Sequence, residues 1–172
     1  MGSLTDAQRE FVALGAAIGA GCQPCTQYHV RAALKAGLGR DEILRALDQA
    51  QAVRQEGGVA VANVGRTLLG LGEEAQAEGC VCNAPQALVH IGSAAGCNAG
   101  GLLARYLETA SGLGLSPEAL AEAVEVAQAV KEKGAIGFFA RDVERALARL
   151  GRVAATPVAA GGSASCCGPG CG

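Results

Sequence analysis

Apolar residues recur along most of this chain at intervals of three and four, the spacing that lines one face of an α-helix. Two long stretches share the pattern, at Ile43, Leu47, Ala50 and Val53 and again at Leu120, Val124, Ala127 and Val130. No stretch alternates apolar and polar residues in the way that a half-buried β-strand requires. The pattern therefore predicts an all-α protein.

Local signals mark where several of these helices begin. Thr5 with Gln8 has the form of a capping box, Pro24 suits the first turn of a second helix, and Ser116 with Pro117 precedes another helical stretch. We expect each half of the chain to contain a first helix, a cysteine-bearing turn, a second helix that ends at Gly-Leu-Gly, a long third helix and a fourth.

Short sequences repeat along the chain and predict a tandem duplication. The sequence AGC at 20–22 recurs at 95–97 and GLG at 37–39 recurs at 112–114, an offset of 75; after a two-residue insertion, AQAVRQEG at 50–57 matches AQAVKEKG at 127–134. We therefore expect two duplicated helical units, an active repeat at 1–72 and a degenerate one at 85–150, joined by a connector at 73–84. Residues 151–172 have a linker composition that includes cysteines, and we expect 152–172 to be poorly ordered.

Composition narrows the possible functions. Half of the 172 residues are hydrophobic but only 3% are aromatic and none is Trp, which favours closely packed helices. The formal net charge is −2 and no block of basic residues occurs, which argues against nucleic-acid and anionic-membrane partners. The N-terminus lacks the basic start of a signal peptide and no window approaches 18 apolar residues, so we expect a cytoplasmic protein without membrane contact.

The stretch GCQPCTQYH at 21–29 contains the candidate chemistry. Pro24 places Cys25 in the first turn of a helix, where backbone N–H groups and the helix dipole stabilise a thiolate. Cys22 lies one turn away, within the Cα separation that a disulfide spans. His29 follows Cys25 by four residues on the same helix face, where it can exchange the thiol proton, and Glu10 on the preceding helix is a plausible partner for the imidazole.

The predicted duplication suggests that one half alone is active. At the offset of 75, the pairs are Cys22 with Cys97, Cys25 with Gly100, His29 with Ala104, and Glu10 with Pro85. The second half therefore keeps the helices and lacks most of the polar candidates. Eight cysteines in a chain without an export signal indicate redox chemistry or metal binding more often than a disulfide scaffold.

Other roles are open for these residues. Cys22, Cys25 and His29 with Cys80 or Cys82 would give zinc four ligands. Glu10 alone is often a solvated charge, and His90 in an apolar run suits a core or interface position in which its polar atoms are satisfied. Adjacent cysteines rarely bond each other, so the tail residues need partners elsewhere. The candidates in the tail, Cys166, Cys167 and Cys171, suit either a relay of electrons to the Cys22–Cys25 pair, the capture of a soft metal or metalloid, or no function.

Taken together, Glu10, the C-x-x-C pair, His29 and the following RAALKAGLGRDEI resemble the alkylhydroperoxidase D and carboxymuconolactone decarboxylase family, strongly over 4–72 and in degenerate form over 85–150. The resemblance implies an all-helical fold, assembly into trimers or hexamers, and no cofactor. In the peroxidase branch it implies that Cys25 attacks the peroxide, Cys22 resolves the sulfenic acid, and His29 and Glu10 relay protons. The decarboxylase branch lacks the dithiol.

The sequence thus predicts a peroxidase or dithiol oxidoreductase that takes a small-molecule peroxide and an external dithiol electron donor. One chain holds two helical units, so three chains would rebuild an assembly of six, and we expect a homotrimer. Two rival functions are a soft-metal or metalloid handling protein, for example for arsenic, copper or mercury, and a decarboxylase-like lyase that uses His29 as an acid or base.

Overall fold

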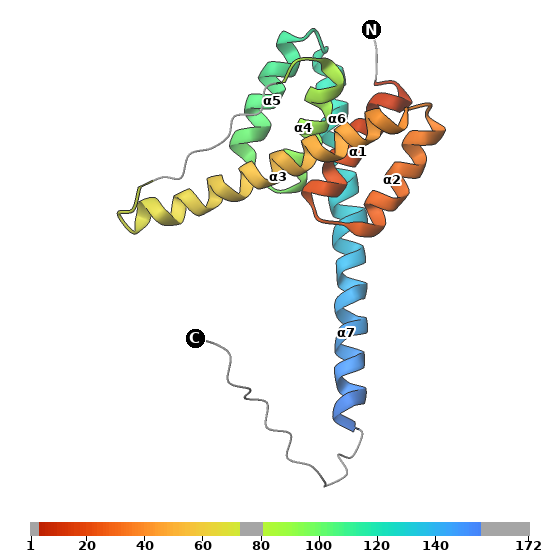
Figure 1. Ribbon diagram of the computed structural model, residues 1–172, viewed down its shortest axis with the longest axis vertical. Helices are drawn as coiled ribbons and strands as arrows, with labels where there is room; N and C mark the ends of the chain where they lie inside the picture. The colour runs from red at the N-terminus through yellow and green to blue at the C-terminus, as the bar shows by residue number, and fades with distance from the viewer. Residues whose placement is uncertain (1–3, 73–80, 156–172) are drawn as a thin grey trace. The chain divides into compact units, whose positions relative to one another are not determined.

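A computed structural model describes residues 4–72 and 81–155 of the chain. Every regular element in these ranges is helical, as the sequence predicted, and they contain no strand. In chain order the elements are α1 (Asp6–Gly19), α2 (Gln23–Lys35), α3 (Arg40–Leu68), α4 (Ala84–Gly96), α5 (Gly100–Gly112), α6 (Pro117–Ala129), the π-helix η1 (Val130–Ile136) and α7 (Gly137–Ala155) (Figure 1). Residues 1–140 form one compact unit, and a second begins at Arg141.

The predicted start signals form the expected caps. Thr5 and Gln8 make a reciprocal capping box at α1, and Pro24 lies in the first turn of α2. At α6 the Ser116 side chain accepts a hydrogen bond from the Ala119 N–H, and Pro117 is the first helical residue. These caps satisfy backbone donors that have no partner inside the helix.

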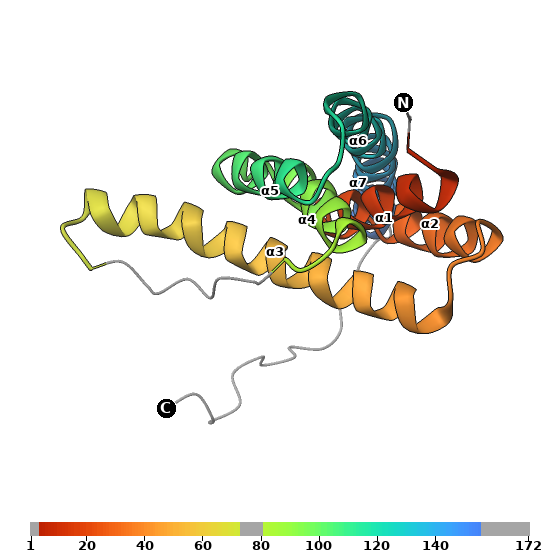
Figure 2. The same ribbon diagram turned by 90° about the horizontal axis from the view of Figure 1, so that it is seen from above.

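Helices α1 and α4 lie side by side at the centre of the first unit (Figures 1 and 2). Glycines make the close approach possible: a methyl group on Gly15 would overlap the Val89 carbonyl, and one on Gly92 would overlap the Val12 carbonyl. Because the backbones touch at these points, small and aliphatic residues fill the core with little need for aromatic side chains. The core residues that are fully enclosed include Val12, Leu14, Leu88, Val89 and Ile91.

From the end of α1 onward, the helices of the two halves correspond at an offset of 77, which corrects the alignment that the sequence suggested; α1 and α4 begin 78 residues apart and end 77 apart. Helix α2 and α5 begin 77 residues apart, as do α3 and α6. The backbone positions with positive φ follow the same offset, Gly21 with Asn98 and Gly37 with Gly114. The repeated AGC and GLG sequences are therefore two residues away from structurally equivalent positions. The two-residue insertion that the sequence suggested is not needed to align the halves.

This register changes the partners of the candidate residues. Cys22, the N-cap of α2, corresponds to Ala99, the N-cap of α5, and not to Cys97. The same offset aligns Cys25 with Leu102, His29 with Tyr106, and Glu10 with Ala87. The second half still lacks the polar candidates, so the inference of one active half does not depend on the alignment. That the halves arose by duplication stays a prediction.

The expected third and fourth helices of the first half are one continuous helix, α3, which runs past the other helices of its unit (Figure 2). No Pro interrupts it, and each Gly within it costs only about 1 kcal/mol relative to Ala. Helix α7 continues to Ala155, beyond the linker boundary expected at Gly151, because Arg152, Val153 and Ala154 are compatible with a helix. Within the described ranges, no helix is both long and apolar enough to cross a membrane.

Candidate redox site

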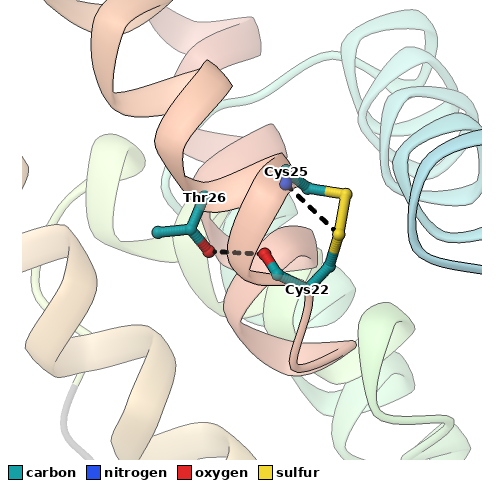
Figure 3. Close-up of a disulfide and its surroundings, with 3 residues drawn as sticks. All are labelled: Cys22, Cys25 and Thr26. Atoms are coloured by element: carbon teal, nitrogen blue, oxygen red, sulfur yellow. Dashed lines mark hydrogen bonds between the residues drawn. A yellow bond between two sulfur atoms is a disulfide. The ribbon is translucent and has the colours of Figure 1, made fainter. Parts of the chain in front are cut away.

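The turn between α1 and α2 carries the cysteine pair. Cys22 and Cys25 form a disulfide with an S–S distance of 2.11 Å and a Cα–Cα distance of 5.3 Å (Figure 3). The pair bridges the N-cap and the first turn of α2, so the bond forms within a single helical turn, as the C-x-x-C spacing predicted. Both residues are buried, with 7% of Cys22 and 4% of Cys25 exposed.

The backbone donor at this helix start points at Cys22. The Cys25 N–H donates to the Cys22 Sγ over 3.2 Å, and the Thr26 hydroxyl donates to the Cys22 carbonyl oxygen over 2.9 Å (Figure 3). The sequence had suggested that the helix start stabilises a thiolate on Cys25. In the disulfide form this N–H is directed at the Cys22 sulfur. Stabilisation of a Cys25 thiolate in the reduced protein stays a prediction.

The Cys25 sulfur instead faces the π-helix η1. A methyl group placed on Gly134 would lie 3.0 Å from the Cys25 Sγ, closer than ordinary carbon–sulfur contact. Glycine at this position thus leaves room for the sulfur. The two sulfurs of one disulfide have different surroundings, and π-helical turns often occur at functional sites.

His29 and Glu10 form the polar part of the site. The His29 Nδ1 lies 2.9 Å from a Glu10 carboxylate oxygen, which joins α2 to α1. The side chains are 15% and 20% exposed, so both are largely shielded from water. When Nδ1 carries the hydrogen and donates it to Glu10, the Nε2 lone pair is available to accept a proton. The structure therefore brings together the two residues that the sequence paired.

A pocket of about 730 Å³ opens beside the disulfide. Its walls come from the end of α1, the start of α2 and the middle of α3, and Cys22 is among the lining residues. Arg54 of α3 also lines it and donates a hydrogen bond from Nη1 to the Ile18 carbonyl over 3.0 Å. Sequence analysis did not identify Arg54, because nothing near it in the sequence indicates that α3 passes the cysteine turn.

A buried polar cluster that joins Glu56 of α3 to residues of the second half was also missed. Glu56 is 7% exposed; its carboxylate accepts hydrogen bonds from the Tyr106 hydroxyl over 2.8 Å and from Arg105. Burial, and then the hydrogen bond to Glu56, raises the pKa of Tyr106 to about 12. His90 packs edge-on against Tyr106 with ring centroids 4.7 Å apart and is 3% exposed, in agreement with the expected core position. The expectation that its polar atoms are satisfied was wrong, because its Nδ1 has no hydrogen-bond partner among the described residues.

Apart from the disulfide pair, the structure describes two cysteines, Cys82 and Cys97. Cys80 and the tail candidates Cys166, Cys167 and Cys171 lie outside the described residues, and Cys82 is exposed. Within residues 4–72 and 81–155, no group of three His, Cys, Asp or Glu side chains is arranged to hold a metal ion. The disulfide also prevents Cys22 and Cys25 from acting as thiolate ligands in this structure.

Residues 1–67, which contain the cysteine pair and its polar partners, match the model of the carboxymuconolactone decarboxylase family. The fold is similar to the crystal structure of a protein from Burkholderia xenovorans LB400 assigned as a gamma-carboxymuconolactone decarboxylase subunit. That similarity has a TM-score of 0.61 at 18% identity and covers 85% of this chain and 80% of the other, so it shows the fold alone. No curated protein shows significant sequence similarity to the chain.

Proposed function

We propose that the protein is a thiol-dependent peroxidase, a dithiol–disulfide oxidoreductase that reduces small-molecule peroxides through Cys22 and Cys25. The observation that carries the proposal is the Cys22–Cys25 disulfide at the start of α2, with the hydrogen-bonded His29–Glu10 pair one helical turn away. A dithiol that closes within one helical turn and has a base nearby matches the requirements of an activated thiol nucleophile. The family match of residues 1–67 also supports it.

The cycle starts from the reduced pair. The Cys25 thiolate attacks one peroxide oxygen, the O–O bond breaks, and Cys25 becomes a sulfenic acid while the other oxygen leaves as an alcohol or water. His29 accepts the Cys25 thiol proton and returns it to the leaving oxygen, and Glu10 orients the imidazole. The Cys22 thiol then loses its proton and its sulfur attacks the Cys25 sulfur, which forms the disulfide. The S–OH bond of the sulfenic acid breaks, and the hydroxyl group leaves with that proton as water. An external dithiol supplies two electrons and two protons to restore both thiols.

Single-turnover oxidation tests this proposal. Fully reduced protein is mixed with one equivalent of hydrogen peroxide or cumene hydroperoxide, and the loss of thiols is followed for the native protein and for Cys25→Ser. We expect rapid loss of about two thiols per chain in the native protein, since one disulfide forms per peroxide consumed. Cys25→Ser should abolish this rapid phase.

Cys97→Ala is the matched control, because it removes a half-buried cysteine from the second half of the same unit. It should leave the rapid phase within a few-fold of the native rate. Equal losses of rate in Cys97→Ala and Cys25→Ser would contradict the proposal, as would a Cys25→Ser protein that reacts normally.

A lyase of the decarboxylase type is the second candidate, and the name of the family matched by residues 1–67 is the observation in its favour. In that case His29 acts as the acid or base and neither sulfur is needed, so Cys25→Ser would retain full turnover. A soft-metal or metalloid function would depend on the tail cysteines Cys166, Cys167 and Cys171. Metal content of protein purified under reducing conditions distinguishes that function from the peroxidase.

The same proposal includes assembly into a homotrimer. The far end of α3 exposes apolar side chains at helical spacing, with Val61, Val64 and Leu68 each 62–83% exposed. Residues spaced by three and four share one helix face, and a contiguous exposed apolar face marks an interaction surface. Copies of the chain that cover this face would remove it from water.

A further inference from the structure

The pocket beside the disulfide has one wall from each of three helices and is lined by only one of the two cysteines. Cys22 lines it, whereas Cys25 does not, and the Cys25 sulfur is turned toward Gly134 of η1. A reagent that enters this pocket therefore lies next to Cys22 and not next to Cys25. Thiol–disulfide exchange depends on which sulfur is accessible to the attacking thiolate.

The only charge on the described lining of the pocket is positive. Among the described residues that line it, Arg54 is the only charged one, and the polar remainder is Thr26 with the amides of Gln23, Gln27, Gln51 and Gln55. No carboxylate from these residues competes for the guanidinium. An arginine in such a lining favours an anionic group, which it can bind with two parallel N–H donors.

Two contacts fix the Arg54 guanidinium in place. Its Nη1 donates to the Ile18 carbonyl at the end of α1, and it lies against Gly21 so closely that a methyl group there would come within 2.8 Å of Nη1. Gly21 also has φ +67°, which other residues rarely adopt. The glycine thus serves both the turn and the placement of the cation beside Cys22.

A purely structural explanation for Arg54 is that it caps the C-terminal end of α1. The second half contains an equivalent residue that has this capping role without a neighbouring disulfide. Lys131, 77 residues further along, donates to the Ala95 carbonyl at the end of α4 in the same way. Cations at this position complement a helix C-terminus. The equivalent of Cys22 there is Ala99, so Lys131 caps a helix where no disulfide is present. Lys131 can therefore serve as a control that separates the capping role of Arg54 from its position in the pocket beside Cys22.

We propose that this pocket receives the reducing substrate, a thiol donor that carries a carboxylate or another anionic group, and that Arg54 binds that group while the donor sulfur attacks Cys22. This inference rests on the proposed redox function. The donor thiolate forms a bond to the Cys22 Sγ, the S–S bond breaks, and Cys25 leaves as the thiolate with the electron pair. A second donor thiol then attacks the donor sulfur of the mixed disulfide, Cys22 leaves as a thiolate, and the donor is released as its disulfide.

Two monothiols with the same two-carbon linker test the charge preference. 3-Mercaptopropionate carries a carboxylate where 2-mercaptoethanol carries a hydroxyl. The rate at which each opens the disulfide is measured in the native protein and in Arg54→Gln, at low ionic strength and normalised to thiolate concentration. Comparing each donor with itself across the two proteins cancels differences in intrinsic thiol reactivity. We expect Arg54→Gln to slow mercaptopropionate about three- to fivefold, the size of an exposed ion pair, and to leave mercaptoethanol within about twofold.

Lys131→Gln is the matched control, since it removes the same charge and the same kind of helix cap. It should leave the ratio of the two thiols as in the native protein, and Arg54→Lys should retain part of the preference because the charge remains. Salt should reduce the preference in the native protein. An unchanged ratio in Arg54→Gln, or an equal change in Lys131→Gln, would overturn the role of Arg54.

The sulfur that is attacked can be read directly. Mercaptopropionate is added with iodoacetamide present, so that the cysteine released from the disulfide is alkylated, and the peptide that contains both cysteines is analysed by fragment mass spectrometry. We expect the mercaptopropionate adduct on Cys22 and the alkyl group on Cys25. The reverse distribution would overturn the assignment of the pocket.

These measurements contain no peroxide, so they are separate from the test of the proposed function. If Cys25→Ser oxidises normally but the thiol preference behaves as expected, the peroxidase proposal fails and the donor pocket stands. If the peroxide result holds and Arg54→Gln changes nothing, the donor pocket alone fails.

Discussion

Acidification is expected to destabilise this protein through His90, which lies in the buried cluster with Glu56, Arg105 and Tyr106. The side chain is 3% exposed, and its Nδ1 has no hydrogen-bond partner among the described residues. Burial lowers the pKa of His90 from the usual 6.5 to about 4; the nearby Glu56 carboxylate acts to raise it, and Arg105 lowers it further. Protonation in the folded state would place a charge beside Tyr106 in a site that is closed to water.

The size of the effect follows from the two pKa values. In the unfolded chain the histidine takes up a proton as the pH falls below about 6.5, whereas the folded protein resists protonation until about pH 4. Stability is therefore fully present above the unfolded pKa and is lost as the pH falls toward the folded one. Between pH 7 and pH 5 this linkage removes about 2 kcal/mol of unfolding free energy.

Urea unfolding at pH 7 and pH 5, followed by far-UV circular dichroism of the oxidised protein, measures this difference. In His90→Phe, which keeps a ring against Tyr106 and removes the titrating group, the loss between the two pH values should shrink by about 2 kcal/mol. The comparison uses the pH dependence and not the absolute stability, so a packing change in the variant does not affect it. An equal loss in the native protein and in His90→Phe would refute the argument.

Three further outcomes are expected. Gly134→Ala should slow oxidation of the reduced protein by peroxide several-fold, because the added methyl group crowds the Cys25 sulfur. Gly57→Ala is the control: its methyl group would lie equally close to the Cys97 sulfur and should not slow the reaction. Equal effects of the two substitutions would contradict this prediction. Glu10→Gln should slow the same oxidation at least about tenfold in stopped-flow assays, since it weakens the hydrogen bond that orients the His29 imidazole, and an unchanged rate would exclude the proposed proton relay. Light scattering at micromolar concentration should give the mass of three chains, and a monomer would rule out the trimer.

Much of the helical framework could be predicted because its causes are local. The capping box at Thr5, the proline in the first turn of α2 and the cap at Ser116 each depend on residues within one turn of the helix end. The Cys22–Cys25 disulfide is local in the same sense, since three residues at a helix start already hold the two Cα atoms at a bonding separation. The Glu10–His29 pair was expected from two neighbouring helices that one short turn connects.

The correspondence between the halves was misread because short words of Ala, Gly and Leu recur easily in a chain of this composition. What fixes the register is the geometry of the helix ends, where Gly21 and Asn98 adopt positive φ and Cys22 and Ala99 are N-caps. Backbone conformation identifies equivalent positions even where the side chains differ. Sequence identity alone aligned Cys22 with Cys97, two positions away from Ala99, its structural counterpart.

The sequence by itself thus determined the helices, the disulfide and the residues able to do chemistry, because each depends on spacing within a few residues. Only the tertiary structure decided how the two sulfurs differ. It brings Gly134 from the second half against Cys25, and it brings Arg54 from the middle of α3 beside Cys22. Such contacts arise because α3 and η1 pack against α1 and α2, which places segments distant in the sequence together, and no local pattern records that packing.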